Sequence, residues 1–219
     1  MTAFSLLRHT VSVLFILFSV ALLTGCTTPL LPTSGPEAES RWQARQPTLD
    51  ALRHWEFNGR IAVQREEEGW FAGLRWEQQG TAYHLQVSGP AGQGAARLEG
   101  DDTGVTLTRN NGAVYRALHP EELLVAHLGW QVPVAGLHYW IRGLPSPLAW
   151  ESRELDNAGH LIRLHQDGWD IHFERYGTVD SFGSSNSLEL PGRLVLERPP
   201  LSVRIIVDHW RLLSNQSHH

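Results

Sequence analysis

Residues 70–88 read WFAGLRWEQQGTAYHLQVS, and this stretch decides the fold of the 219-residue chain. Apolar side chains alternate with other residues in both of its halves. They are Ala72, Leu74 and Trp76 in the first half, and Tyr83, Leu85 and Val87 in the second. A period of two is typical of a β-strand that buries one face, and the Gln79-Gly80 pair between the halves is a turn signal. The stretch therefore predicts two neighbouring antiparallel strands, 70–78 and 82–88.

The same period continues on both sides of this hairpin, with turn residues between the runs. The other predicted strands are 56–63, 95–99, 105–108, 113–116, 149–155, 160–166, 169–175, 192–198 and 202–207, and the pattern allows the last to continue to Leu212. Connections this short favour an antiparallel meander over βαβ units, which need long crossovers. We expect a mainly β chain with about eleven strands.

Three helical segments interrupt or precede the strands. Between Glu39 and Trp55, apolar residues recur at spacings that suit a helix with one buried stripe, interrupted or restarted at Pro47. A second helix is expected from Pro120 to about Gly129, with acidic residues in its first turn. A third is expected over 133–142 and is apolar on most sides, which predicts burial on more than one face.

Each predicted strand has one apolar face, so the sheet should carry one continuous apolar inner surface. If the sheet curves and the short helices cover this surface, the result is an apolar cavity. A filled barrel or sandwich core would give the same sequence pattern. The pattern does not separate these two interpretations.

The start of the chain predicts a bacterial lipoprotein leader. An apolar run over 11–23 ends at Leu22-Leu23-Thr24-Gly25-Cys26, and Cys26 is the only cysteine. We expect residues 1–25 to be a signal peptide, Cys26 to carry lipid, 26–38 to be a flexible tether, 39–213 to be the folded body and 214–219 to be a tail. Thr27 in place of an aspartate favours the outer membrane, with the body facing the periplasm. An ordinary secretory peptide beside a chance cysteine is the alternative.

Composition excludes several function classes. The formal net charge is −5, which argues against nucleic-acid binding, and the chain contains no lysine. A Walker-A phosphate loop and a Schiff-base lysine are therefore excluded. The spacing of His160, His165 and His172 does not match a metal motif, and no nucleophile elbow occurs. We expect no cofactor, no metal and no enzymatic activity.

A set of motifs in a fixed order resembles the LolB family of outer-membrane lipoprotein receptors. The motifs are Gly59–Val63, Leu74–Gln78, Tyr83–Leu85, Gly89–Gly92, Pro120–Leu124, Leu128-Gly129, Pro133-Val134, Tyr139–Pro145 and Ile206–Trp210. Together they span roughly residues 40–212. The resemblance implies an incomplete, eleven-stranded antiparallel β-barrel whose helices form a lid over an apolar cavity. It also implies a monomer that takes lipoproteins from the periplasmic carrier LolA and inserts them into the outer membrane.

Candidate site residues fall into two groups. Seven apolar residues are candidates for the surface that contacts acyl chains, although any of them could instead be plain core: Leu74, Trp76, Leu85, Val87, Val105, Leu107 and Trp140. By resemblance, the loop Gly89-Pro90-Ala91-Gly92 protrudes and inserts into the membrane, with Ala91 where the family carries a bulky apolar residue. An ordinary Gly-Pro turn is the alternative there.

Two further interpretations concern partners and function. The acidic run Glu66-Glu67-Glu68 could steer a basic rim on the carrier, but such runs are more often plain solvated turns. The alternative function is a structural outer-membrane lipoprotein or a periplasmic hydrolase of all-β fold.

Overall fold

The computed structural model describes residues 35–90, 95–180 and 187–213. The predicted leader, Cys26, most of the predicted tether, Ala91, Gly92 and the predicted tail lie outside these residues. The hydrophobic core of the described residues runs from Ala38 to Leu212 and falls within the compact unit Thr33–His219. Because this unit contains that whole core, we expect it to fold without the residues that precede it. No helix in the described part of the chain is both long and apolar enough to cross a membrane.

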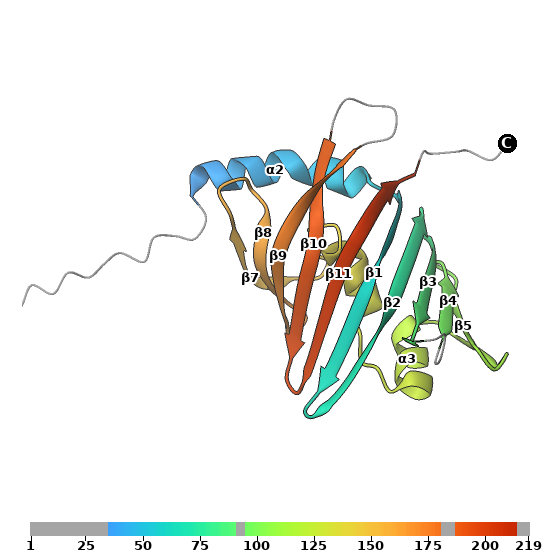
Figure 1. Cartoon of the computed structure of the whole chain (residues 1–219). Helices are drawn as coiled ribbons and strands as arrows, with labels where there is room; N and C mark the ends of the chain where they lie inside the picture. The colour runs from blue at the N-terminus through green and yellow to red at the C-terminus, as the bar shows by residue number, and fades with distance from the viewer. Residues whose placement is uncertain (1–34, 91–94, 181–186, 214–219) are drawn as a thin grey trace, which may run out of the picture. The chain divides into compact units, whose positions relative to one another are not determined.

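Eleven antiparallel strands form one sheet in the order β6-β5-β4-β3-β2-β1-β11-β10-β9-β8-β7 (Figure 1). Their bounds are β1 His54–Arg65, β2 Glu68–Gln79, β3 Ala82–Ser88, β4 Ala96–Gly100, β5 Val105–Arg109, β6 Val114–Ala117, β7 Trp150–Leu155, β8 Leu161–Gln166, β9 Trp169–Asp180, β10 Ser187–Arg198 and β11 Leu201–Leu212. Pairing of β1 with β11 joins the two meanders. Strands β6 and β7 are the two edges and do not pair with each other, so the sheet stays open. The predicted incomplete barrel is confirmed.

Strands β9 and β10 are longer than predicted. The sequence pattern indicated 169–175 and 192–198, whereas the structure continues β9 to Asp180 and begins β10 at Ser187. The added residues pair with each other, from Tyr176 opposite Pro191 to Asp180 opposite Ser187. Most of the added part of β9 is exposed, so its sequence lacks the alternation that marks a half-buried strand.

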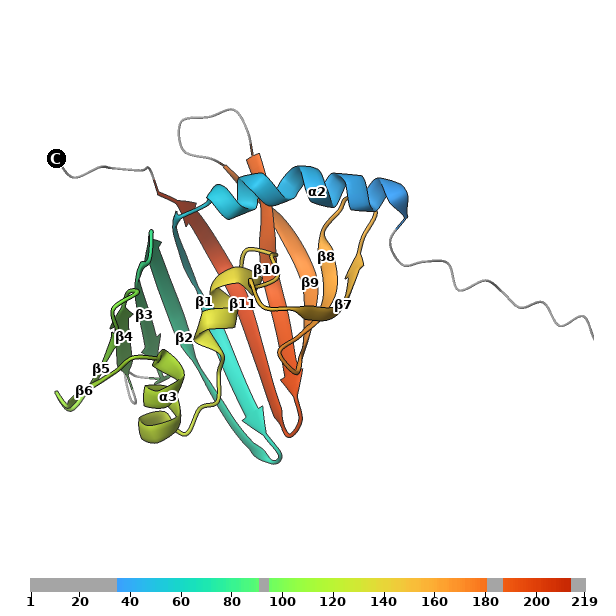
Figure 2. The same ribbon diagram turned by 180° about the vertical axis from the view of Figure 1, so that it is seen from behind.

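Helix α2, Pro36–Ala51, lies across one end of the sheet over β7 to β10 (Figures 1 and 2). The helix begins within the predicted tether, three residues before Glu39, with Pro36 in its first turn, where the missing N–H has no cost. It continues through Pro47, so the predicted interruption is wrong. The predicted helical extension to Trp55 is wrong as well, because Trp55 belongs to β1.

The N-terminal half of α2 packs tightly on the β7–β8 hairpin. Trp42 and Ala38 are buried there, and Arg153 of β7 donates hydrogen bonds to both carboxylate oxygens of Glu39, at 2.8 and 2.9 Å. Gly159 in the hairpin has a φ of 79°, and a Cβ atom there would lie 2.6 Å from the backbone nitrogen of Trp42. Glycine is therefore required at this crossing.

Helices α3, Pro120–Leu128, and α4, Val134–Trp140, lie against the inner face of the sheet (Figure 2). Gly129 ends α3 in the left-handed conformation, with a φ of 72°. Both helices interrupt the chain between the edge strands β6 and β7. They cover the inner face of the open sheet, as the family resemblance implied.

Candidate functional site

The inner face of the sheet and the two helices enclose an apolar cavity. Its lining residues are Ile61, Leu74, Trp76, Leu85, Val87, Ala96, Leu98, Leu107, Leu124, Leu128, Trp130, Val132, Val134, Leu137 and Ile205. The volume of this cavity is about 30 Å³. In this conformation the side chains of the two helices nearly fill the hollow of the sheet.

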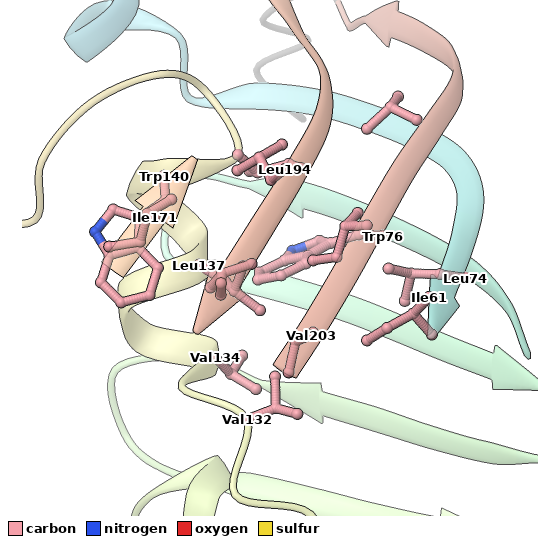
Figure 3. Packing of buried hydrophobic residues seen from close by; sticks show 14 of the residues in the cluster. Ile61, Leu74, Trp76, Val132, Val134, Leu137, Trp140, Ile171, Leu194 and Val203 are labelled. Carbon is pink, nitrogen blue, oxygen red and sulfur yellow. The ribbon is translucent and has the colours of Figure 1, made fainter. Parts of the chain in front are cut away.

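Helix α4 and the segment before it form the inner wall of the lid. Figure 3 shows Val132, Val134 and Leu137 pointing toward Val203 and Trp76 on the sheet. All three lid side chains are at most 4% exposed. Their contacts with the sheet are apolar and therefore non-directional.

Helix α3 is attached to the sheet by two aromatic contacts at its C-terminal end. The rings of Trp130 and of Trp70 on β2 lie 4.1 Å apart, measured between their centroids. The ring of His127 stacks on Tyr115 of β6 at 3.6 Å. Such pairs contribute about 0.5–1.5 kcal/mol each beyond their area burial, so α3 is held by interactions of moderate strength.

A buried polar cluster connects α4 to the sheet beside the cavity. Trp76 Nε1 donates a hydrogen bond to Oε1 of Gln78, and Gln78 Nε2 donates to the carbonyl oxygen of Gly80. Nδ1 of His138 on α4 lies 3.2 Å from the same Gln78 oxygen. Since that oxygen only accepts, Nδ1 carries the proton. Burial, together with the charge of Arg142, lowers the pKa of His138 to about 4, so this imidazole is neutral at pH 7.

Arg142 follows α4 and connects it to the end of α2. Its side chain donates hydrogen bonds to the carbonyl oxygens of Leu49 and Leu52 at 3.0 and 3.1 Å, and to that of His138 at 3.1 Å. The carbonyls of Leu49 and Leu52 lie at the C-terminal end of α2, where few intrahelical donors remain, and that of Leu49 also accepts from the backbone nitrogen of Leu52 at 3.2 Å. Burial lowers the pKa of Arg142 to about 10, which still leaves the guanidinium charged at pH 7.

Five of the seven predicted cavity residues line the cavity: Leu74, Trp76, Leu85, Val87 and Leu107. Val105 is buried at the start of β5, outside the lining. The indole of Trp140 is buried too, but its nitrogen donates to Gln166 Oε1 at 2.8 Å on the side of α4 away from the cavity. Contact of any of these side chains with acyl chains stays a prediction.

The alternation of the strands does not identify the helical half of the lining. This half consists of residues that form the lid: Leu124, Leu128, Val132, Val134 and Leu137. The available signal was the apolar character of residues 133–142 on most sides, which predicted burial on more than one face. It did not say which face would point into a cavity.

The start of the predicted insertion loop lies at the end of β3. Gly89 is buried and Pro90 is exposed, and both border a hollow of about 430 Å³ on the outer face of the sheet. Phe71 of β2 lines the same hollow and is 68% exposed, more than most large apolar side chains in the described residues. Ala91 and Gly92 fall outside the described residues.

Two of the histidines considered as metal ligands contact different acidic side chains. His160 lies between Asp156 and Glu189, at 2.8 and 3.1 Å from their carboxylate oxygens, while His172 contacts Asp170. Among the residues that the structure describes, no three side chains of histidine, cysteine, aspartate or glutamate are arranged to hold a metal ion.

Two solved structures share the fold of this chain. A LolA superfamily protein from Nitrosomonas europaea matches with a TM-score of 0.50 and 10% identity, covering 81% of this chain and 94% of that one. A domain described as an outer membrane lipoprotein-sorting protein, from Vibrio parahaemolyticus, matches with a TM-score of 0.52 and 10% identity, covering 82% and 95%. At this identity the likeness supports the fold alone.

Several proteins are more similar to this chain in sequence than these two structures are. The outer-membrane lipoprotein LolB of Nitrosococcus oceani is 38% identical over 90% of this chain and 96% of its own length. The protein of the same name from Pseudomonas fluorescens is 35% identical over 93% and 96%, and that of Coxiella burnetii is 35% identical over 90% and 91%. These relatives are named as lipoproteins and not as enzymes, in agreement with the sequence-based expectation. The model of the family "Outer membrane lipoprotein LolB" matches residues 53–210, and the chain belongs to this family.

Proposed function

We propose that this chain is a lipid-anchored receptor of the outer membrane, facing the periplasm. It accepts lipoproteins from the carrier LolA in the cavity beneath α3 and α4, and inserts them into the outer membrane. Cys26 carries the anchor, and the receptor works as a monomer without a cofactor. The observation that supports this proposal best is the lid: two helices with apolar inner faces cover an apolar sheet that is open between β6 and β7.

The physical reason for such a receptor is the cost of exposing acyl chains to water. Each CH₂ group removed from an apolar environment costs about 0.8 kcal/mol, so free lipoproteins do not cross the periplasm. Transfer between two apolar cavities avoids the aqueous intermediate. It proceeds without an energy source if the receptor binds the chains more tightly, and a difference of about 1.4 kcal/mol shifts the distribution tenfold.

The small size of the closed cavity makes lid opening part of the mechanism. An acyl chain that enters pushes Leu124, Val134 and Leu137 away from the sheet and takes over their contacts. Because apolar contacts are exchanged for apolar contacts, the net cost of opening is small once the chain is in place. The polar cluster of Gln78 and His138 lies beside the cavity and positions α4 on closing.

Label transfer tests the proposed function directly. The soluble unit Thr33–His219, which lacks Cys26, is mixed with LolA that holds a radiolabelled lipoprotein, and the two proteins are separated and counted. We expect label to move to this chain without ATP. Label that stays on the carrier while both proteins remain folded would contradict the proposal.

Membrane insertion by the loop at Pro90 is a second step of the same proposal. Ala91 is a small side chain and buries little area, so its contribution to membrane contact is weak. We expect Ala91→Leu to keep or improve delivery of lipoprotein from the receptor to vesicles, and Ala91→Glu to impair delivery while transfer from the carrier stays intact. Unchanged delivery by Ala91→Glu would remove the loop from the mechanism.

A further inference from the structure

Another apolar hollow lies on the outer side of α4. Its volume is about 640 Å³, far larger than that of the closed inner cavity. We call it the outer groove and define it by its lining: Glu121, Val125, Gln131, Val132, Pro133, Ala135, Gly136, Tyr139, Trp140, Ser146, Pro147, Leu148, Asp167 and Arg198. Apolar side chains dominate this lining, and charged residues of both signs lie among them.

The outer groove and the inner cavity share one wall. Val132 lines both of them, while Val134 and Leu137 of α4 face the cavity and Ala135 and Tyr139 face the groove. Helix α4 is therefore apolar on both its inner and its outer face. Its inner face packs on the sheet, and its outer face borders a groove that no other part of the described chain fills.

Buried hydrogen bonds hold the opposite wall of the groove in place. Gln166, whose side chain is fully buried, accepts from the backbone nitrogen of Ser146 at 2.9 Å and donates to the carbonyl oxygens of Ser146 and Leu148 at 3.1 and 2.7 Å. The same amide accepts from Trp140. The groove is thus preformed on this side and not a gap between loose segments.

One polar group in the groove lacks a partner. Ser146 is 8% exposed, and its hydroxyl is buried without a hydrogen-bond partner among the described residues. A buried hydroxyl without a hydrogen-bond partner is unfavourable, which favours a ligand that supplies the missing bond. Leu148 on the same wall is 60% exposed and Val125 on the facing helix is 47% exposed, so both rims offer apolar surface.

We propose that the outer groove binds the polypeptide segment of the cargo that directly follows its lipid-bearing residue. This inference rests on the proposed function. Backbone N–H and C=O groups do not enter an apolar cavity without partners, so the polypeptide has to leave the cavity where its acyl chains enter. The groove on the other side of Val132 and α4 adjoins the cavity, and its Ser146 hydroxyl pairs with a backbone group of the segment.

The side chains of the groove suit an extended segment rich in small residues and proline. Tyr139, Pro133 and Pro147 offer the flat aromatic and proline surface that binds such segments elsewhere. Residues 27–34 of this chain, TTPLLPTS, illustrate the composition expected next to a lipidated cysteine. Glu121 and Arg198 at the groove accommodate charges of either sign farther along the segment.

The test compares two synthetic probes on the unit Thr33–His219. One probe is a triacylated cysteine, and the other is the same lipid followed by the tail TTPLLPTS; both dissociation constants are measured by intrinsic tryptophan fluorescence. We expect the tail to tighten binding by about tenfold in the unmodified protein. Leu148→Asp should reduce this gain to about twofold or less, with binding of the tail-free probe unchanged, because the charge opposes only what lies in the groove.

Leu118→Asp is the matched control, because Leu118 is 72% exposed and lies outside the groove, and it should keep the full gain. Ser146→Ala should reduce the gain in part, since it removes the hydroxyl and leaves the backbone bonds to Gln166. Equal binding of both probes by the unmodified protein would overturn the inference and leave the proposed function standing. Equal weakening of both probes by Leu148→Asp would assign the groove to an acyl chain and overturn it as well. Binding of neither probe would overturn the proposed function itself.

Discussion

Trp140 donates a hydrogen bond from its indole nitrogen to the side-chain oxygen of Gln166, over 2.8 Å and with both side chains buried. This bond joins the last residue of helix α4 to the end of strand β8. Gln166 also holds Ser146 and Leu148, so one amide positions both the lid helix and the segment that leads into β7. Substitution of Gln166 should therefore have a measurable effect on stability.

Gln166→Leu should lower the free energy of unfolding by about 3 kcal/mol or more, because it leaves the Trp140 indole and the backbone N–H and C=O of Ser146 buried without partners. Urea denaturation followed by tryptophan fluorescence measures the change. Gln86→Leu on the exposed face of β3 is the control and should change stability by less than about 0.5 kcal/mol. Equal effects of the two substitutions would contradict the role assigned to the Gln166 amide.

Trp130→Ala should loosen α3 without unfolding the sheet, because it removes the ring contact with Trp70. Amide hydrogen exchange of residues 120–128 should then accelerate by up to about tenfold, as expected from the loss of an aromatic pair. Trp150→Ala, at an exposed position on the edge strand β7, is the control and should leave exchange in α3 unchanged. If Trp130→Ala leaves α3 equally protected, the pair does not hold the lid.

The sheet could be predicted from the sequence because its strands bury one face. Buried residues such as Ala72, Leu74 and Trp76 alternate with other residues along the strand and so identify that face. Turn residues gave the connections, so nine of the eleven strands were placed within a few residues. The remaining errors lie where this signal is absent. Exposed positions such as Thr178 do not alternate, and helix α2 continues through Pro47 because burial of Trp42 and Leu49 on either side outweighs the local effect of proline.

The candidate site was predictable only in part, for a different reason. The sheet half of the cavity follows from strand faces, whereas the lid half depends on how α3 and α4 pack in three dimensions. The polar contacts are least visible in the sequence. Gln166 and Ser146 are separated by 20 residues, and Arg142 lies 93 residues from Leu49. A single sequence carries no periodic pattern that joins such pairs.

Arg142→Met should lower the free energy of unfolding by about 2–4 kcal/mol, since it keeps most of the apolar stem and removes the donors to Leu49 and Leu52. The C-terminal turn of α2 should also lose protection from hydrogen exchange, because its carbonyls lose their only side-chain donor among the described contacts. Arg97→Met on the exposed face of β4 is the matched control and should have little effect. If stability falls while α2 stays protected from exchange, Arg142 does not stabilise the protein through its bonds to the end of α2.

Stability should depend on pH through His138, and the sign follows from its lowered pKa. Burial holds the pKa near 4 in the folded protein, against 6.5 for the free side chain. Between these values the unfolded chain binds a proton that the folded chain does not, so stability rises with pH from about 4 to 6.5 and is nearly constant above. The full difference is at most about 3 kcal/mol at 1.36 kcal/mol per pKa unit.

Because carboxylates titrate in the same range, the measurement is a comparison of two proteins. His138→Gln removes the titrating group and keeps a side-chain donor toward Gln78. The unfolding free energy of the unmodified protein should fall more steeply between pH 6.5 and 4 than that of the variant, and the two curves should run parallel above pH 7. The loss of stability at acidic pH arises at α4, because His138 has to become charged while it is buried between this helix and the sheet. Acidification should therefore speed hydrogen exchange in residues 134–140 before it affects the central strands, and identical pH curves for the two proteins would show that His138 is not the responsible group.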